Sequence, residues 1–158
     1  NLYGPGDNYH SENSHVIPGL LRRFHEGKIQ KSPFVKVWGT GEPCREFLYV
    51  DDMASGSIHV MNLPKEEYIK NTSAMQSHIN IGYGSDITVY DLAVMIKKVV
   101  DYKGNIELDK SKSDGTPKKI LDSTKINSLG WSPKFRLEEG LELTYKNFIE
   151  SYDNLRES

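Results

Sequence analysis

The sequence predicts an α/β fold, because amphipathic helical patterns alternate along the chain with short apolar runs. Apolar residues recur at helical spacing in stretches that begin near Val16, Val89 and Leu141. Short apolar runs bounded by polar residues or glycine lie between them and are typical of strands. The predicted strands cover residues 36–38, 47–50, 79–82 and 106–108.

The composition is that of an ordinary globular protein. The chain has 158 residues, of which 37% are hydrophobic and 27% charged, enough for one core-forming domain. A formal net charge of −2 argues against nucleic acid or an anionic membrane as partner. The single cysteine, Cys44, excludes an intrachain disulfide framework and fits a reducing compartment, so we expect a cytoplasmic protein. Because the first residue is Asn1, we expect the chain to begin inside a longer gene product.

Several helix boundaries can be predicted from capping residues. Asp51 or Asp52 is expected to cap the helix that ends before Pro64. Thr88, with Asp91 three residues later, resembles a capping box. Ser123 or Thr124 is expected to cap a short helix that ends near residue 130, whereas 27–33 and 65–77 read as a polar connector and a charged surface region.

A turn and an arginine dominate the stretch from residue 37 to 53. Gly39, Gly41 and Pro43 predict a turn, and Arg45 stands between this turn and the following strand. A guanidinium group near the indole of Trp38 suits a phosphate or a flat polar ligand. The alternative is an ion pair between Arg45 and a carboxylate such as Glu46 or Asp51.

Two other segments have alternative interpretations. The run Gly-Tyr-Gly at 82–84 lacks the third glycine of a dinucleotide fingerprint, because Ile87 stands there, so we read it as the exit from a strand. Residues 110–119 are polar and basic. They form either a solvated loop or a flap that carries charge to an anionic ligand.

His15 is the strongest single candidate for chemistry. It precedes an amphipathic helix, where the positive end of the helix dipole favours a neutral imidazole that can shuttle protons. Arg22 and Arg23 follow on that helix about 100° apart, so at most one of them should face a site. The five histidines and one cysteine form no metal-binding motif, and we expect no metal. No Tyr-x-x-x-Lys pair is present, so the hydride-transfer machinery is not expected in this chain.

Three runs carry a family resemblance: Asn-Leu-Tyr-Gly-Pro at 1–5, Asn-Ser-His-Val-Ile-Pro at 13–18, and Trp-Gly-Thr-Gly-Glu-Pro-Cys-Arg-Glu-Phe-Leu-Tyr-Val-Asp-Asp-Met-Ala at 38–54. The chain resembles the extended short-chain dehydrogenase/reductases that act on nucleotide sugars, and among them the GDP-L-fucose synthases. The likeness extends to about Ile149 but covers only the C-terminal half of such an enzyme. It implies a small substrate-binding domain in residues 1–150, with edge elements of a Rossmann domain such as 47–50 or 79–82. Residues 151–158 are then a frayed tail, and the N-terminal Rossmann half is absent.

The resemblance also implies an activity. Such an enzyme converts GDP-4-keto-6-deoxy-D-mannose to GDP-L-fucose by 3,5-epimerisation and NADPH-dependent 4-reduction. NADP would be bound mainly by the missing half, the parent would be a homodimer, and the isolated chain would be inactive. Cys44 lies outside the motif of the family's catalytic cysteine and is read as a turn-packing residue. Another nucleotide-sugar epimerase or dehydratase, or a non-catalytic nucleotide-sugar-binding module, stays open as an alternative.

Individual residues match the family's functional positions. His15 matches the histidine that acts as acid/base in epimerisation and lies at the cofactor. Asn1 and Leu2 match the segment along the nicotinamide end of NADP. The residues that match substrate-binding positions are Arg23, Trp38, Arg45, Asp114 and Lys119.

Overall fold

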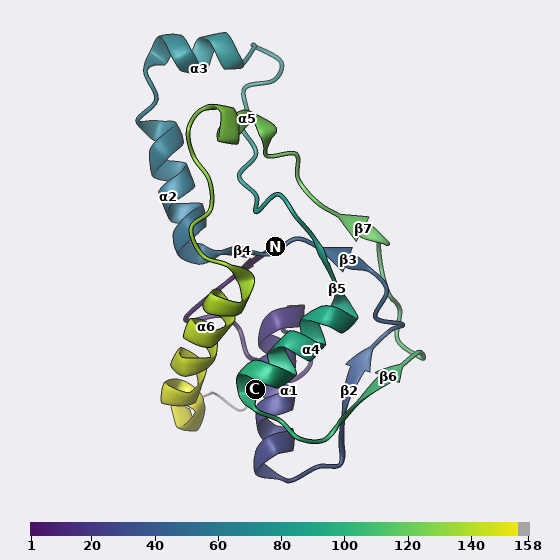
Figure 1. Cartoon of the computed structure of the whole chain (residues 1–158). Coiled ribbons are helices and arrows are strands. Elements are labelled where there is room, and N and C mark those ends of the chain that lie inside the picture. The colour runs from purple at the N-terminus through teal and green to yellow at the C-terminus, as the bar shows by residue number, and fades with distance from the viewer. Residues whose placement is uncertain (155–158) are drawn as a thin grey trace.

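The computed structural model describes residues 1–154 and confirms the α/β class. Its helices are α1 (Val16–Ile29), α2 (Val50–Met61), α3 (Lys65–Asn71), α4 (Val89–Val100), α5 (Thr124–Ser128) and α6 (Leu137–Ser151), with a 3-10 turn at Tyr152–Asn154. Its strands are β1 (Leu2–Tyr3), β2 (Phe34–Trp38), β3 (Cys44–Arg45), β4 (Leu48–Tyr49), β5 (Ile87–Thr88), β6 (Asn105–Asp109) and β7 (Lys118–Lys119). Helices α1, α4 and α6 gather at one end of the molecule, and α2, α3 and α5 at the other (Figure 1).

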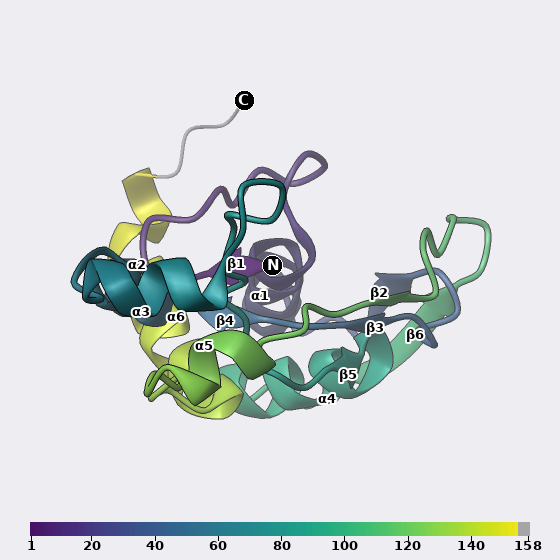
Figure 2. The ribbon, with the colours of Figure 1, turned by 90° about the horizontal axis from the view of Figure 1, so that it is seen from above.

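The strands form small separate sheets. β1 pairs with β4 in parallel, and β2 pairs with β6 in parallel along its whole length. β3 lies between β5, which is antiparallel to it, and β7, which is parallel. Seen from above, β2, β3 and β6 lie on one side of the molecule with the loop after β6, and α2 and α3 lie on the other (Figure 2).

The main core lies where α1, α4 and α6 pack together. Phe24 of α1, Leu92 and Ile96 of α4, and Leu141 and Phe148 of α6 are all fully buried. These residues belong to the apolar stripes that the sequence predicts, because an amphipathic helix buries one face against its neighbours. α1 therefore offers a rigid support for any polar residue on its remaining face.

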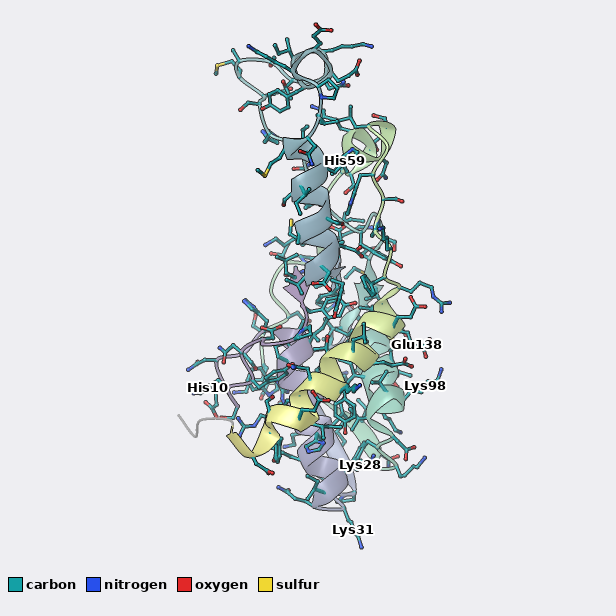
Figure 3. All side chains as sticks on the ribbon, turned by 90° about the vertical axis from the view of Figure 1, so that its left-hand side faces the viewer. His10, Lys28, Lys31, His59, Lys98 and Glu138 are labelled. Atoms are coloured by element: carbon teal, nitrogen blue, oxygen red, sulfur yellow. The ribbon has the colours of Figure 1, made fainter. Side chains whose placement is uncertain are left out.

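A second, smaller cluster joins α2 to α5. Trp131 packs with Leu48 and Ile126, and its Nε1 donates a hydrogen bond to Ser55 Oγ at 3.1 Å. The Nε2 of His59 on α2 donates to the carbonyl of Leu129 at 2.9 Å, and Figure 3 shows His59 facing α5. Trp131 is thus a packing residue. No helix within residues 1–154 has the length and hydrophobicity to cross a bilayer.

The predicted start of α2 is wrong. The helix begins at Val50, and its N-cap residue, Tyr49, makes no side-chain capping hydrogen bond. The aspartates that were expected to cap the helix lie inside its first turn. Asp52 is 1% exposed, and its carboxylate accepts from the backbone N–H groups of Lys134 at 2.9 Å and Phe135 at 3.0 Å. The carboxylate therefore holds the loop before α6 instead of the first turn of its own helix.

Two other predicted boundaries also differ. α1 continues to Ile29, so the connector begins later than residue 27; Gly27 is buried, with no room for a Cβ beside Val35. Residues 79–82 belong to no strand. Polar side chains hold this part of the chain instead of a neighbouring strand: Asn80 Nδ2 donates to the carbonyl of Asp122, and Glu46 Oε1 accepts from the backbone N–H of Gly84.

The caps of α4 and α5 follow different patterns. Thr88 Oγ1 accepts from Asp91 N at 3.0 Å, so Thr88 caps α4 as predicted. Asp91 Oδ2 accepts from the Thr88 hydroxyl at 2.6 Å and not from the Thr88 backbone N–H, so the predicted capping box is formed only in its N-cap half. Ser123 is the N-cap residue of α5 but makes no capping hydrogen bond; Asp122 Oδ1 accepts from Thr124 N instead.

The predicted fraying from residue 151 is wrong over the described part of the tail. Ser151 ends α6, and the ring of Tyr152 packs on His25 with the centroids 4.6 Å apart. This contact fixes the end of the helix against α1. Residues 155–158 of the predicted tail lie outside the described residues.

His25 is a buried titratable group at the centre of this aromatic contact. It is 9% exposed, its Nδ1 lies 2.9 Å from Tyr145 Oη, and Phe148 and Tyr152 pack against its ring. Burial lowers the pKa of His25; Lys28 acts in the same direction and Glu26 opposes it. Folding therefore favours the neutral ring.

This burial predicts a loss of stability in mild acid. Because the pKa of His25 is lower in the folded chain than in the unfolded one, its contribution is complete above an unfolded value of about 6.5 and is lost as the pH falls below it. We predict that the thermal midpoint falls between pH 7 and pH 5, and that the fall is smaller in the double variant His25→Phe/Tyr145→Phe. Circular dichroism melts at both pH values measure this, with Tyr145→Phe alone as the control that keeps the histidine. Equal falls in all three proteins would contradict it.

Candidate functional site

The predicted substrate-binding residues come from α1, the end of β2, β3 and the segment 110–119, which we call the flap. The guanidinium carbon of Arg23 lies 4.4 Å from the centroid of the Trp38 ring, and Lys112 Nζ of the flap lies 5.3 Å from the same centroid. Trp38 ends β2 and is 40% exposed. α1, β2 and the flap thus meet at one indole, which attracts cations through its ring face.

Arg23 is the free arginine of the adjacent pair on α1. Its Nη1 donates to the carbonyl of Lys36 at 3.1 Å, while its Nε is buried without a partner in the part of the chain described. Burial lowers the pKa of Arg23, and none of the ion pairs among residues 1–154 includes it. Arg22 bonds to Glu26 and to the carbonyl of Tyr9 and is therefore structural.

Asp114 ties the flap to the turn after β2. Its Oδ1 accepts from Thr40 N at 2.6 Å and its Oδ2 from Thr40 Oγ1 at 2.8 Å. Gly39 and Gly41 have φ of +84° and +79°, which favour glycine, and Asp114 occupies the space that a Cβ at Gly39 would take. The predicted turn is confirmed, and the flap lies over it.

Arg45 stands on β3 next to the same flap. Its Nη1 donates to the carbonyl of Cys44 at 2.8 Å, and a Cβ at Gly115 would lie 3.7 Å from its Nη2. Arg45 is paired in register with Lys119 of β7, so both side chains lie on one face of the sheet. No carboxylate among residues 1–154 forms an ion pair with Arg45, so the alternative of a pair with Glu46 or Asp51 is wrong.

The surroundings of Arg45 are partly hollow. A cavity of about 210 Å³ is lined by Arg45 together with Phe47, Tyr83 and Leu137. Lys119 is exposed and makes no side-chain hydrogen bond within the described chain. Cys44 Sγ donates to the carbonyl of Glu42 at 3.7 Å, which agrees with a packing role in the turn.

Glu46 is a site residue that the sequence analysis missed. It is 3% exposed; its Oε1 accepts from Gly84 N at 2.7 Å and its Oε2 from Leu121 N at 3.0 Å. Its carbonyl accepts from Asn1 Nδ2 at 2.9 Å. The signal that could have revealed Glu46 is its position directly before an apolar run, where a side chain can become buried. A buried carboxylate requires hydrogen-bond donors, so partners for Glu46 could have been sought.

His15 is the N-cap residue of α1. Its side chain is exposed and makes no capping hydrogen bond, while its carbonyl accepts from Gly19 N at 3.0 Å. A Cβ at Gly19 would lie 2.7 Å from Ser14 Oγ and 3.3 Å from Arg23 Nη2. The guanidinium of Arg23 therefore reaches the start of α1, next to the residue that precedes His15.

Asn1 and Leu2 lie at the β1 end of the site. Leu2 is 46% exposed and lines a cavity of about 210 Å³ with Gly4, Pro5 and Val50. Asn1 is joined to the rest of the site through the carbonyl of Glu46, as described above. Within residues 1–154, no group of three or more His, Cys, Asp or Glu side chains is arranged to hold a metal ion.

A protein-family model described as the NAD dependent epimerase/dehydratase family matches residues 1–82. The chain belongs to this family. It is 57% identical over 156 residues to GDP-L-fucose synthase of Escherichia coli (strain K12), covering 99% of this chain and 49% of that protein. It is 50% identical over 151 residues to probable GDP-L-fucose synthase 1 of Oryza sativa subsp. japonica, covering 96% and 43%.

A solved structure of a related protein has the same fold as this chain. A GDP-L-fucose synthetase from Naegleria fowleri bound to NADP superimposes with a TM-score of 0.84 at 28% identity, covering 99% of this chain and 47% of that one. The chain thus spans about half the length of the relatives it matches. The resemblance drawn from the three sequence runs is confirmed, and so is the assignment to a part of an extended reductase fold.

The geometry of Glu46 predicts a stability effect at the site. Glu46→Ala removes the acceptor of two backbone N–H groups and should lower the free energy of unfolding by about 1–3 kcal/mol. Glu42→Ala, in the turn that precedes β3, is the matched control because Glu42 is exposed. Urea denaturation measures both variants, and an equal loss in the two would show that the buried carboxylate contributes nothing specific.

Proposed function

We propose that this chain is the nucleotide-sugar-binding portion of a GDP-L-fucose synthase. The complete enzyme converts GDP-4-keto-6-deoxy-D-mannose to GDP-L-fucose by epimerisation at C3 and C5 and NADPH-dependent reduction at C4. The observation that carries the proposal is the contact of Arg23 with the exposed indole of Trp38, together with Arg45 beside the flap. Neither arginine has a carboxylate partner among residues 1–154. The names of the relatives from Escherichia coli and Oryza sativa favour this substrate over that of another nucleotide-sugar enzyme.

Each residue has a role that suits its chemistry. The planar guanidinium of Arg45 binds the diphosphate through paired hydrogen bonds, and Arg23 contributes a second cation to the same ligand. The ring of Trp38 packs against the nucleotide sugar. Asp114 and Lys119 bring the flap to the ligand, Asp114 through its anchor on the turn and Lys119 through its place beside Arg45.

His15 provides proton transfer during epimerisation. Its imidazole is exposed at a helix N-terminus and makes no hydrogen bond within residues 1–154, so both ring nitrogens are available to a substrate. Removal of a proton from C3 or C5 and its return to the opposite face require an acid and a base. His15 supplies one of these groups, and the other lies outside this chain.

The residues at the β1 end fit an NADP molecule bound mainly by another part of the protein. The exposed Leu2 beside its cavity offers an apolar surface to a flat ring. The family resemblance assigns Asn1 and His15 to the same cofactor rim. NADPH supplies the hydride for the C4 ketone when it is bound. The isolated chain is expected to be inactive as a reductase, because its sequence has no Tyr-x-x-x-Lys pair.

The cellular location and the oligomeric state of the complete enzyme are part of the same proposal. Its single cysteine in this portion supports a cytoplasmic location, and the family resemblance supports a homodimer. A purely binding module would lack the catalytic partners altogether. Sequencing the reading frame upstream of Asn1 separates the two, because an enzyme requires a Gly-rich loop and a Tyr-x-x-x-Lys pair there.

We predict that Arg45 determines affinity for the diphosphate. Loss of one partner from such a desolvated pair costs about 2–5 kcal/mol, so Arg45→Ala should weaken GDP binding strongly and Arg45→Lys less. Guanosine, which lacks phosphate, should bind all three forms equally. Calorimetry on the complete protein measures this, and Arg136→Ala, an exposed arginine paired with Glu139, is the control. Unchanged GDP affinity in a folded Arg45→Ala protein would assign this residue a structural role only.

We predict that His15→Gln damages epimerisation more than ketone reduction. The variant keeps a hydrogen-bonding side chain but removes the titrating ring. Exchange of the C3 and C5 protons of GDP-4-keto-6-deoxymannose with deuterated solvent, followed by NMR, measures the effect in the complete protein. His78→Gln is the matched control because His78 is also exposed. Normal exchange in His15→Gln would remove this residue from the mechanism.

A further inference from the structure

The loop that precedes α1 is held by the ring of His10. His10 Nδ1 lies 3.0 Å from the backbone nitrogens of both Glu12 and Asn13. A backbone N–H group can only donate, so Nδ1 accepts both hydrogen bonds and the proton of the neutral ring sits on Nε2. The two hydrogen bonds thus define which tautomer the neutral His10 ring adopts.

These hydrogen bonds belong to a small closed network around Asn13. Its N–H is held by His10, and its carbonyl accepts from Asn8 Nδ2 at 3.2 Å. Asn8 Oδ1 in turn accepts from the backbone N–H of His10 at 3.0 Å. Both backbone polar groups of Asn13 are therefore fixed two residues before His15.

The remainder of the loop is anchored to the body of the protein. Tyr9 is 5% exposed, its ring packs on Phe148 with the centroids 4.7 Å apart, and its carbonyl accepts from Arg22 Nη1 at 2.9 Å. Figure 3 shows His10 on the loop beside α1, on the side away from the ion pair of Lys98 and Glu138. With Tyr9 fixed, the path of the chain to α1 depends on the turn that His10 closes.

Among the described residues, the side chain of His15 has no hydrogen-bond partner. It makes no capping hydrogen bond, and its backbone is held through its carbonyl by Gly19. The direction in which its imidazole leaves the helix is therefore set by the backbone that arrives from Asn13. A shift there moves the ring directly, since no side-chain hydrogen bond within residues 1–154 holds it.

We propose that His10 is a positioning residue for His15: its Nδ1 fixes the backbone at 12–13 and so places the imidazole of His15 at the substrate. This inference rests on the proposed function, because it requires His15 to exchange protons with the sugar. Misplacing a reacting group by about 1 Å can cost 100-fold in rate. Loss of the His10 acceptor should therefore lower turnover and leave ligand affinity unchanged.

Three substitutions of His10 separate this role from simple packing. The side-chain oxygen of His10→Asn can occupy the position of Nδ1 and accept the same two hydrogen bonds, whereas the amide of His10→Gln lies near the position of Nε2. His10→Ala removes both positions. In the complete protein, we expect about a 10- to 100-fold fall in the rate of C3 and C5 deuterium exchange for His10→Ala and His10→Gln, with KM unchanged, and near wild-type exchange for His10→Asn.

Hydrogen exchange of the loop, followed by mass spectrometry of peptides covering residues 8–14, provides a readout that does not depend on activity. His10→Ala and His10→Gln should lose protection there and His10→Asn should keep it. Lost protection with normal sugar exchange would overturn the positioning role, and so would unchanged protection in His10→Ala. If His10→Ala does not fold, the comparison of His10→Gln with His10→Asn decides. A wild-type enzyme that exchanges no sugar proton would overturn the proposed function, and this inference with it.

Discussion

The carboxylate of Glu46 accepts hydrogen bonds from backbone groups 38 and 75 residues further along the chain, at Gly84 and Leu121. A carboxylate that is 3% exposed is tolerated only when donors replace its water, so these segments must stay where they are. Gly84 leads into β5 and Leu121 follows β7, the two neighbours of β3. This one buried charge thus reinforces the strand pairing that places Arg45 beside Lys119 and the flap.

The residues proposed to contact the ligand lie partly on rigid elements and partly on loops. Arg23 stands on α1, whose other face is buried in the core with α4 and α6, so its position is set by helix packing. Asp114 of the flap accepts a hydrogen bond from Thr40 in the turn, and Lys112 of the flap lies over the indole of Trp38. A scaffold that presents charged residues on loops is the usual way in which an α/β protein builds a binding site.

Features decided by nearby residues could be predicted from the sequence. The apolar stripes of α1, α4 and α6 and the capping of α4 by Thr88 depend on neighbours within a few positions, and all are found. The roles of Asp52 and Glu46 could not be predicted, because their partners lie far along the chain and the local pattern suggested a cap or an ion pair. The contact of Arg23 with Trp38 likewise requires the packing of β2 beside α1.

The candidate site residues were found mainly through the family resemblance, and physical reasoning alone left several open. The spacing alone placed His15 at the start of a helix, which the structure confirms. It left Arg45 either to bind a ligand or to pair with a carboxylate, and no such ion pair is found within residues 1–154. The loop hydrogen bonds of His10 have no sequence signature, because they depend on the ring's orientation over its own backbone.

The central proposal is that Arg23, Trp38 and Arg45 bind the same GDP-sugar molecule. A crystal structure of the complete protein with GDP bound tests it most directly. The account predicts diphosphate oxygens at about 2.7–2.9 Å from the guanidinium nitrogens of Arg45, with Arg23 in the same site and the nucleotide against the ring of Trp38. GDP bound elsewhere, with Arg45 and Trp38 both free of it, would contradict the account.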